Sequence, residues 1–233
     1  MMAKQDFYRD RYDERLTRSV SDFAMFVLQP FPFSKANRKQ RSSFVASSLS
    51  SARYHDAGKA SAQVHNAAQK LNAIESTLPA RFHPKFAEMC KWLPVIFGHE
   101  YQVLNHADLE GPNTHVDESS GAIPGIVDWK FAEFGPFGMA LGALEFFLGV
   151  QTADPEWIWH PQHHHLRAVF YQALCENLTK YQFCLDPDAV EAARAFSLFT
   201  TFAGSDKEDP KGLYLMTLDA CLAEATAVQP LLQ

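Results

Sequence analysis

The sequence lacks the features that mark several large classes of protein. Its 233 residues contain no uninterrupted apolar run of membrane-spanning length, and the first residues, MMAKQDFYRDRYDERLTR, are too charged for a signal peptide. The net charge of −6 gives no basic excess, whereas nucleic-acid binders need a basic face to recognise phosphates. We therefore expect a cytoplasmic protein that binds neither a membrane nor a nucleic acid.

Cysteine is also scarce, and its spacing excludes the common cysteine frameworks. No C-x-x-C pair occurs among Cys90, Cys175, Cys184 and Cys221, so we expect reduced, mostly buried thiols without a disulfide or zinc framework. Apolar residues make up 47% of the chain and charged residues 21%, which is the composition of a soluble globular protein. The length suits one domain that buries its own core.

Glycine is missing from the first quarter of the chain. The first one is Gly58, so no G-x-G-x-x-G phosphate-binding loop can lie upstream of it. Lys35, Lys39 and Lys59 lie in polar stretches without β alternation. This context predicts solvated surface lysines rather than a lysine on a strand of the V-A-I-K type.

Helical periodicity covers most of the remaining chain. It predicts an amphipathic helix over 12–27 that ends before Pro30, followed by a Ser-rich basic stretch at 34–59 that is either a loop or a weak helix. Another helix is predicted to begin at Asp186 as N-cap, with Pro187 in its first turn, and to stop at Gly204. Further helices are predicted at 64–78, 85–93, 141–148, 166–181 and 211–227.

The segment 102–128 has a different character. VLNHADL, NTHVD and AIPGIVDW are short and rich in β formers, and Glu118-Ser119-Ser120-Gly121 has the chemistry of a hairpin turn. We find no internal repeat and no domain boundary. The sequence thus predicts one mainly helical (α+β) domain over 1–233, with a small β-hairpin inserted near its middle.

Polar residues flank this hairpin at a spacing that suits phosphoryl transfer. The reaction needs a carboxylate to orient and deprotonate the acceptor hydroxyl, and oxygen ligands that hold Mg²⁺ against the nucleotide phosphates. Asp108 is followed by Asn113 five residues later, and Asp128 comes after the hairpin. Each residue alone is more often structural, but the three together are typical of a catalytic loop and a metal loop.

The stretch 104–145 resembles the aminoglycoside phosphotransferase and choline-kinase-like families of the protein-kinase-like fold. These families read H-x-D-L-x-x-x-N and [IV]-D-W, and the continuation through Pro136-Phe137-Gly138 looks like the version found in filamentous fungi. The resemblance implies a helical C-lobe over 1–233, with the catalytic loop, hairpin and metal loop at 102–129. It implies that Asp108 is the catalytic base, that His106 braces its loop, and that Asn113 and Asp128 bind Mg²⁺.

The resemblance also implies ATP as a cofactor and a small molecule with an alcohol group as the substrate. Members of these families carry a nucleotide lobe, a sheet with a phosphate-covering loop and a lysine. The residues before His106 are predicted to be helices and loop, so we expect the C-lobe alone, with weakened ATP-dependent transfer. The face left without a lobe would be covered by a partner chain, by self-association, or by Phe23, Phe26, Phe31 and Phe33.

Two alternatives remain open. The chain could be a pseudokinase that acts as a binding or scaffold module, or a biosynthetic enzyme that uses Asp108 as a general base without ATP. Some of the 19 phenylalanines could line an apolar pocket facing Asp108.

The tract HPQHHHLR is a separate candidate. On a helix, its His160 and His164 would have the spacing of a transition-metal pair. Pro161 favours a different reading, in which the tract lies on an exposed junction between a loop and a helix.

Overall fold

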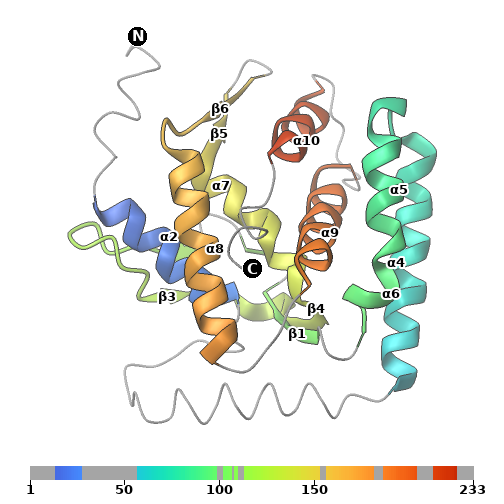
Figure 1. Ribbon diagram of the computed structural model, residues 1–233, viewed down its shortest axis with the longest axis horizontal. Helices are drawn as coiled ribbons and strands as arrows, with labels where there is room; N and C mark the ends of the chain where they lie inside the picture. The colour runs from blue at the N-terminus through green and yellow to red at the C-terminus, as the bar shows by residue number, and fades with distance from the viewer. Residues whose placement is uncertain are drawn as a thin grey trace.

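The computed structural model describes residues 14–27, 57–98, 102–106, 108–109, 113–152, 156–180, 186–203 and 212–224 (Figure 1). It is mainly helical, as predicted. The α-helices are α2 (Glu14–Val27), α4 (Ala57–Thr77), α5 (His83–Lys91), α6 (Leu93–Ile96), α7 (Glu145–Leu148), α8 (His163–Lys180), α9 (Pro187–Leu198) and α10 (Leu213–Ala223). The 3-10 segments are η1 (Ala80–Phe82), η4 (Trp129–Phe131) and η5 (Phe137–Leu144), and η6 (Phe199–Ala203) is a π-helical turn that continues α9.

The predicted helices are confirmed where local signals were strong. The side chain of Asp186 accepts a hydrogen bond from the Asp188 amide at 2.9 Å, and Pro187 follows it, so α9 begins where the cap predicts. The stretch 141–148 differs, because most of it is 3-10 helix before the short α7. Most of 34–59 lies outside the described residues.

The predicted hairpin is confirmed as β2 (Thr114–His115) paired with β3 (Gly125–Ile126), in the register Thr114↔Ile126. Its turn is closed by the Gly121 amide, which donates to the Asp117 carbonyl at 2.7 Å. Gly121 has φ 69°, a conformation that glycine adopts without steric cost. The Asp117 carboxylate accepts from Ser119 and Ser120, and these hydrogen bonds lower its pKa.

Two other antiparallel pairs were not predicted. Strand β1 (Gln102–Asn105) pairs with β4 (Glu133–Pro136), and β5 (Gly149–Gln151) pairs with β6 (Trp157–Trp159). The β1–β4 pair places Asn105 opposite Glu133, so it brackets the hairpin and brings the start of the 102–128 segment beside residues that follow the segment.

Two apolar cores meet along α9. The first joins α2 and α8 to η5 and the hairpin, and the second joins α4, α5 and α10 to α9. Figure 1 shows α2 crossing α8 on one side of the molecule, α4 and α5 together on the other, and α9 between them. Buried members of the two cores include Val20, Phe23, Leu144 and Phe170 in the first, and Leu71, Phe86, Phe199 and Leu218 in the second.

The contact between η5 and α9 is unusually close. A Cβ atom built on Gly138 would lie 1.9 Å from the Cβ of Ala193, and one built on Gly142 would lie 2.5 Å from Ser197 Oγ. Only glycine at these two positions lets the backbones approach this far. The contact determines where Ser197 and the π-turn η6 lie relative to the strands.

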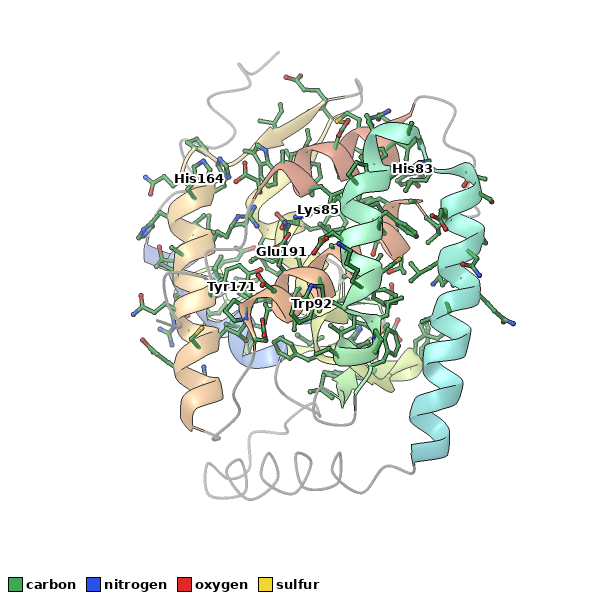
Figure 2. All side chains as sticks on the ribbon, turned by 45° about the vertical axis from the view of Figure 1, so that its right-hand side comes forward. His83, Lys85, Trp92, His164, Tyr171 and Glu191 are labelled. Atoms are coloured by element: carbon green, nitrogen blue, oxygen red, sulfur yellow. The ribbon has the colours of Figure 1, made fainter. Side chains whose placement is uncertain are left out.

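A buried ionic cluster links α7, α8 and α9. Glu145 is fully buried, and its carboxylate accepts two hydrogen bonds of 2.7 Å from Arg167 and one of 2.8 Å from Arg194. Arg194 also contacts Glu191, which pairs with Lys85 of α5 at 3.1 Å (Figure 2). Burial opposes the charge of Arg194, but Glu191 and Glu145 outweigh this effect and raise its pKa.

Several other expectations fall partly outside the described residues. Phe23 is buried against Phe147 and Phe170, whereas the side chains of Phe26, Phe31 and Phe33 are not described. The idea that they cover a face left without a lobe therefore stays a prediction. Cys90, Cys175 and Cys221 form no disulfide, and Cys184 is not described. None of the described helices is both long and apolar enough to cross a membrane.

Candidate functional site

The two predicted loops are joined through His106. This residue follows β1 directly, is 3% exposed, and makes a 2.7 Å hydrogen bond between its Nε2 and the carbonyl oxygen of Val127. Its ring lies edge-on to Trp129, with 4.7 Å between the ring centroids. The bond to Val127 ties the segment before Asp108 to the residue before Asp128.

A second link comes from Asn113, at the start of the hairpin. Its backbone carbonyl accepts a hydrogen bond of 2.9 Å from the Val127 amide. Its side-chain Nδ2 donates to the Asp108 carbonyl at 2.7 Å and reaches the Asp108 carboxylate at 3.4 Å. Asn113 therefore holds both loops, and the hairpin register places the ends of the two loops side by side.

Asp128 occupies a special backbone conformation. With φ 62° and ψ 50° it lies in the left-handed region, and within the described ranges it is the only residue other than glycine with a positive φ. Aspartate tolerates this region better than most residues, and such outliers often occur at functional sites. The carboxylate is partly exposed and pairs with Lys130 Nζ at 3.0 Å. The indole of the next residue, Trp129, donates to the Ile126 carbonyl at 2.8 Å and helps to hold the turn.

A cavity of about 270 Å³ opens beside Asp108. It lies where the two cores meet, between the strand-end loop, η5 and α7, the end of α9 with η6, and α4. The lining residues are Lys70, Asn105, Asp108, Leu109, Met139, Ala140, Ala143, Phe146, Ser197, Thr200 and Thr201. Asn113 and Asp128 are not among them, so the cavity reaches the predicted base but not the predicted metal ligands.

Asn105 adds a polar group to the wall of this cavity. Its side-chain nitrogen donates to the carbonyls of Val103 and Pro136, at 3.3 and 3.2 Å. Its Oδ1 is buried and has no hydrogen-bond partner in the part of the chain that the structure describes. A buried acceptor left unpaired is costly, and this oxygen is closed to solvent, so it is an unsatisfied group behind the cavity wall.

Other lining residues carry hydroxyl groups. Ser197 Oγ donates to the Met139 carbonyl at 2.6 Å, and Thr200 Oγ1 donates to the Phe196 carbonyl at 2.9 Å. Both hydroxyl oxygens keep the capacity to accept a hydrogen bond from a ligand. The π-turn that contains Thr200 and Thr201 is a feature that recurs at functional sites.

Sequence reasoning identified Asp108 but missed most of the cavity. Asn105, Ser197 and Thr200 belong to no motif, and they meet Asp108 only through the packing of η5 on α9. One signal was available, because Ser197, Thr200 and Thr201 interrupt the apolar pattern of the helix predicted to stop at Gly204. Phe146 is the phenylalanine of the described chain that lines this cavity, in keeping with the expectation of an aromatic residue near Asp108.

No known protein family matches the chain, and neither a curated protein nor a solved structure matches it. The kinase-like assignment of His106, Asp108, Asn113 and Asp128 therefore stays a prediction, which rests on the loop motifs and on the geometry given above.

Proposed function

We propose that the protein is a small-molecule phosphotransferase of the kinase-like type, in which Asp108 accepts the proton of a substrate hydroxyl group. The observation that carries this proposal is that Asp108 lines a cavity while its loop is hydrogen-bonded to the loop of Asp128. Phosphoryl transfer asks for this combination of a positioned carboxylate and a neighbouring set of oxygen ligands.

The substrate of this reaction would occupy this cavity. At about 270 Å³ the cavity lies near the lower end of small-molecule sites, which span about 300–1,000 Å³. Met139, Ala143 and Phe146 offer apolar contacts, and Ser197 and Thr200 offer polar ones. A compact alcohol with an apolar body fits this lining.

Asn113 and Asp128 fit Mg²⁺ by the chemistry of their donor atoms. Because Nδ2 of Asn113 is engaged by Asp108, the side-chain atom it can offer to a cation is the oxygen Oδ1. Asp128 adds a carboxylate, and Mg²⁺ prefers such hard oxygen ligands. When bound, Mg²⁺ would supply positive charge to the phosphate groups of a nucleotide. Lys130, which is exposed, would then leave the Asp128 carboxylate for solvent.

A second candidate is general base catalysis by Asp108 without a nucleotide. Two observations favour it: the Asp128 carboxylate lies outside the cavity and pairs with Lys130, and the described residues before β1 are helical rather than a sheet bearing a lysine. On this reading, the protein would bind or convert a cavity ligand whether or not ATP is present.

A titration with Mg²⁺ and ATP separates the two candidates. Phosphotransfer predicts that Mg²⁺–ATP raises the melting temperature, that Asp128→Asn abolishes this shift, and that Asp108→Asn keeps the shift but stops transfer to an alcohol. Asp219→Asn is the matched control, because Asp219 is also an exposed carboxylate paired with a basic side chain, here Arg81 at 2.8 Å.

No melting shift with Mg²⁺–ATP, together with no hydrolysis or transfer, would reject the phosphotransferase. Binding of a small alcohol that Asp108→Asn weakens, in the absence of ATP, would then support the second candidate. A cavity ligand that binds equally well to Asp108→Asn would instead support a binding or pseudokinase module.

A further inference from the structure

The histidine tract meets an acidic residue from a distant part of the chain. His163 and His164 begin α8, and Glu224 follows the last residue of α10. Oε2 of Glu224 lies 3.3 Å from Nδ1 of His164 and 3.8 Å from Nδ1 of His163. One ligand atom from each of the three residues lies within 4.8 Å of the other two. Figure 2 places His164 at the end of α8 that leads toward β6.

We propose that His163, His164 and Glu224 form a binding site for a divalent transition metal of the zinc class. The first argument is the state of His163. Its Nδ1 is buried, yet it has no hydrogen-bond partner among the residues described, and it faces the Glu224 carboxylate beyond hydrogen-bond distance. A buried nitrogen left in this state is destabilising unless something else occupies its lone pair.

The second argument is that the ring of His163 is held in place. It stacks on Trp159, with 4.9 Å between centroids and 15° between the planes, and the centroid of the His164 ring lies 3.9 Å from its own. The side chain of His163 is only 13% exposed. A ring fixed in this way keeps its nitrogen directed at one point, which favours metal binding because little side-chain freedom is lost.

The third argument is that Glu224 is positioned through its backbone rather than its carboxylate. The Glu224 carbonyl accepts a hydrogen bond from Arg194 Nη2 of the buried ionic cluster, so the carboxylate remains directed at the two imidazoles. The side chain is 18% exposed. Hydrogen bonds from neighbouring residues to a ligand residue fix the geometry of a metal site in this way.

An ordinary ion pair between a charged histidine and Glu224 explains the cluster less well. Nδ1 of His163 lies 3.8 Å from Oε2 of Glu224, too far for the hydrogen bond that such an ion pair would make. Burial lowers the pKa of His163, as do His164 and Arg167, whereas Glu224 and Glu145 raise it. A positive charge on the first turn of α8 is also unfavourable. The positive charge of Arg167 is offset by its two hydrogen bonds to Glu145. A neutral imidazole is the form that binds a metal.

The donor set indicates the kind of metal. Two imidazole nitrogens and one carboxylate oxygen suit Zn²⁺, Ni²⁺, Co²⁺ or Cu²⁺, whereas Mg²⁺ and Ca²⁺ prefer oxygen ligands alone. Three protein ligands plus water is the pattern of an open zinc site, with bonds of about 2.0–2.2 Å. His164 is 75% exposed, so its ring can rotate to close the remaining distance and leave one position for solvent. A bound ion would fasten the end of α10 to the start of α8.

Calorimetric titration of Zn²⁺ into the untagged, chelator-treated full chain tests this site. We expect one equivalent of Zn²⁺ to bind, affinity to fall at least tenfold in His164→Ala and in Glu224→Gln, and Mg²⁺ to give no binding heat. His165→Ala is the matched control, because His165 is the next, exposed residue of the same tract and lies outside the cluster. Its affinity should stay within twofold of the natural sequence.

Two results would overturn the proposal: no stoichiometric binding of Zn²⁺, or an equal loss of affinity in His165→Ala and His164→Ala, which indicates an adventitious histidine tract only. Circular dichroism of each variant shows whether it is folded, and the exposed position of His164 makes that variant the safest. A melting temperature raised by Zn²⁺ in the natural chain and not in Glu224→Gln would further support the link between α10 and α8. The result is independent of Asp108 and of ATP.

Discussion

The surroundings of Glu145 and of Asp108 differ sharply, although both residues are acidic and both lie close to η5. Glu145 is fully buried, and two guanidinium groups satisfy its oxygens with hydrogen bonds of 2.7–2.8 Å. Asp108 lines a cavity, and among the described residues its carboxylate has one long contact, 3.4 Å from Asn113. The first charge is neutralised within the fold, and the second is left available.

This difference separates a charge that is paired within the fold from a charge that lines a cavity. A buried carboxylate is tolerated when paired and hydrogen-bonded, and it then contributes to a defined packing of the helices around it. A carboxylate at a cavity with few partners contributes little to stability but can accept a proton or a ligand. Among the histidines, Nε2 of His106 is bonded to Val127, whereas Nδ1 of both His106 and His163 has no hydrogen-bond partner in the described chain.

The largest predicted effect is that of Glu145→Gln. The substitution leaves Arg167 and Arg194 buried with part of their pairing lost, and breaking a buried pair typically costs about 3–5 kcal/mol. The parallel change Asp108→Asn should cost less than about 1 kcal/mol, because the carboxylate has few partners to lose among the described residues. Urea unfolding of both variants measures the difference. Equal losses of stability in the two variants would contradict the distinction between the two sites.

The next effect concerns the packing that forms the cavity wall. Gly138→Ala puts a methyl group 1.9 Å from the Cβ of Ala193, and overpacking of this kind costs about 1–3 kcal/mol. Gly125→Ala is the control, since a Cβ there has no atom within 4 Å. We expect that variant to be neutral or slightly more stable than the natural chain. The midpoint of urea unfolding reports both, and a neutral Gly138→Ala would mean that η5 and α9 can separate without cost.

The parts of this fold that the sequence predicts are those set by neighbouring residues. The N-cap and first-turn proline identify the start of α9, and the turn residues identify the hairpin, because these signals act over a few positions. The pairing of β1 with β4 depends on residues about thirty positions apart, and no local pattern encodes it. The 3-10 form of η5 likewise follows from its close approach to α9, which becomes visible only in three dimensions.

The candidate site likewise contains residues that the sequence identifies and residues that only the structure shows. Asp108, Asn113 and Asp128 could be selected from their spacing, because a motif is a local pattern. Asn105 and Ser197 line the same cavity but come from a strand and a helix that meet through tertiary packing. The partnership of the histidine tract with Glu224 spans about sixty positions, so the sequence does not show it. The sequence offers His160 with His164 and favours an exposed junction between a loop and a helix. The tract does lead into α8, but His160 is buried, and it is His163 and His164 that meet Glu224.

A smaller effect is predicted at Asp128, where charge and backbone conformation can be separated. Its left-handed conformation costs a residue such as alanine about 1 kcal/mol relative to glycine, whereas aspartate and asparagine tolerate it better. We therefore expect Asp128→Asn and Asp128→Gly to unfold close to the natural chain, and Asp128→Ala to be about 1 kcal/mol less stable. The exposed pair with Lys130 adds little. If Asp128→Asn were as unstable as Asp128→Ala, the charge itself would be structural, as it is for Glu145.

The smallest predicted effect is a dependence of stability on pH. Burial lowers the pKa of His160 and, with help from His164, that of His163 below the ordinary 6.5. Just below pH 6.5 the unfolded chain therefore binds more protons than the folded chain does. The contribution of these histidines to the free energy of unfolding is fully present above pH 6.5, and it is lost as the pH falls toward their pKa values in the folded chain. Burial opposes the charge of Glu191, but Arg194 and Lys85 outweigh it and lower its pKa below 4.5, so the ionic cluster loses stability only in more acidic solution.

Urea unfolding at pH 7.5 and pH 5.5, with chelator present, isolates the histidine contribution. We expect a loss at pH 5.5 of up to about 1 kcal/mol for each histidine, since one pKa unit corresponds to about 1.4 kcal/mol. His163→Gln should reduce this loss, whereas His165→Gln, in the exposed part of the tract, should leave it unchanged. A loss that is the same in His163→Gln would assign the pH dependence to groups other than His163.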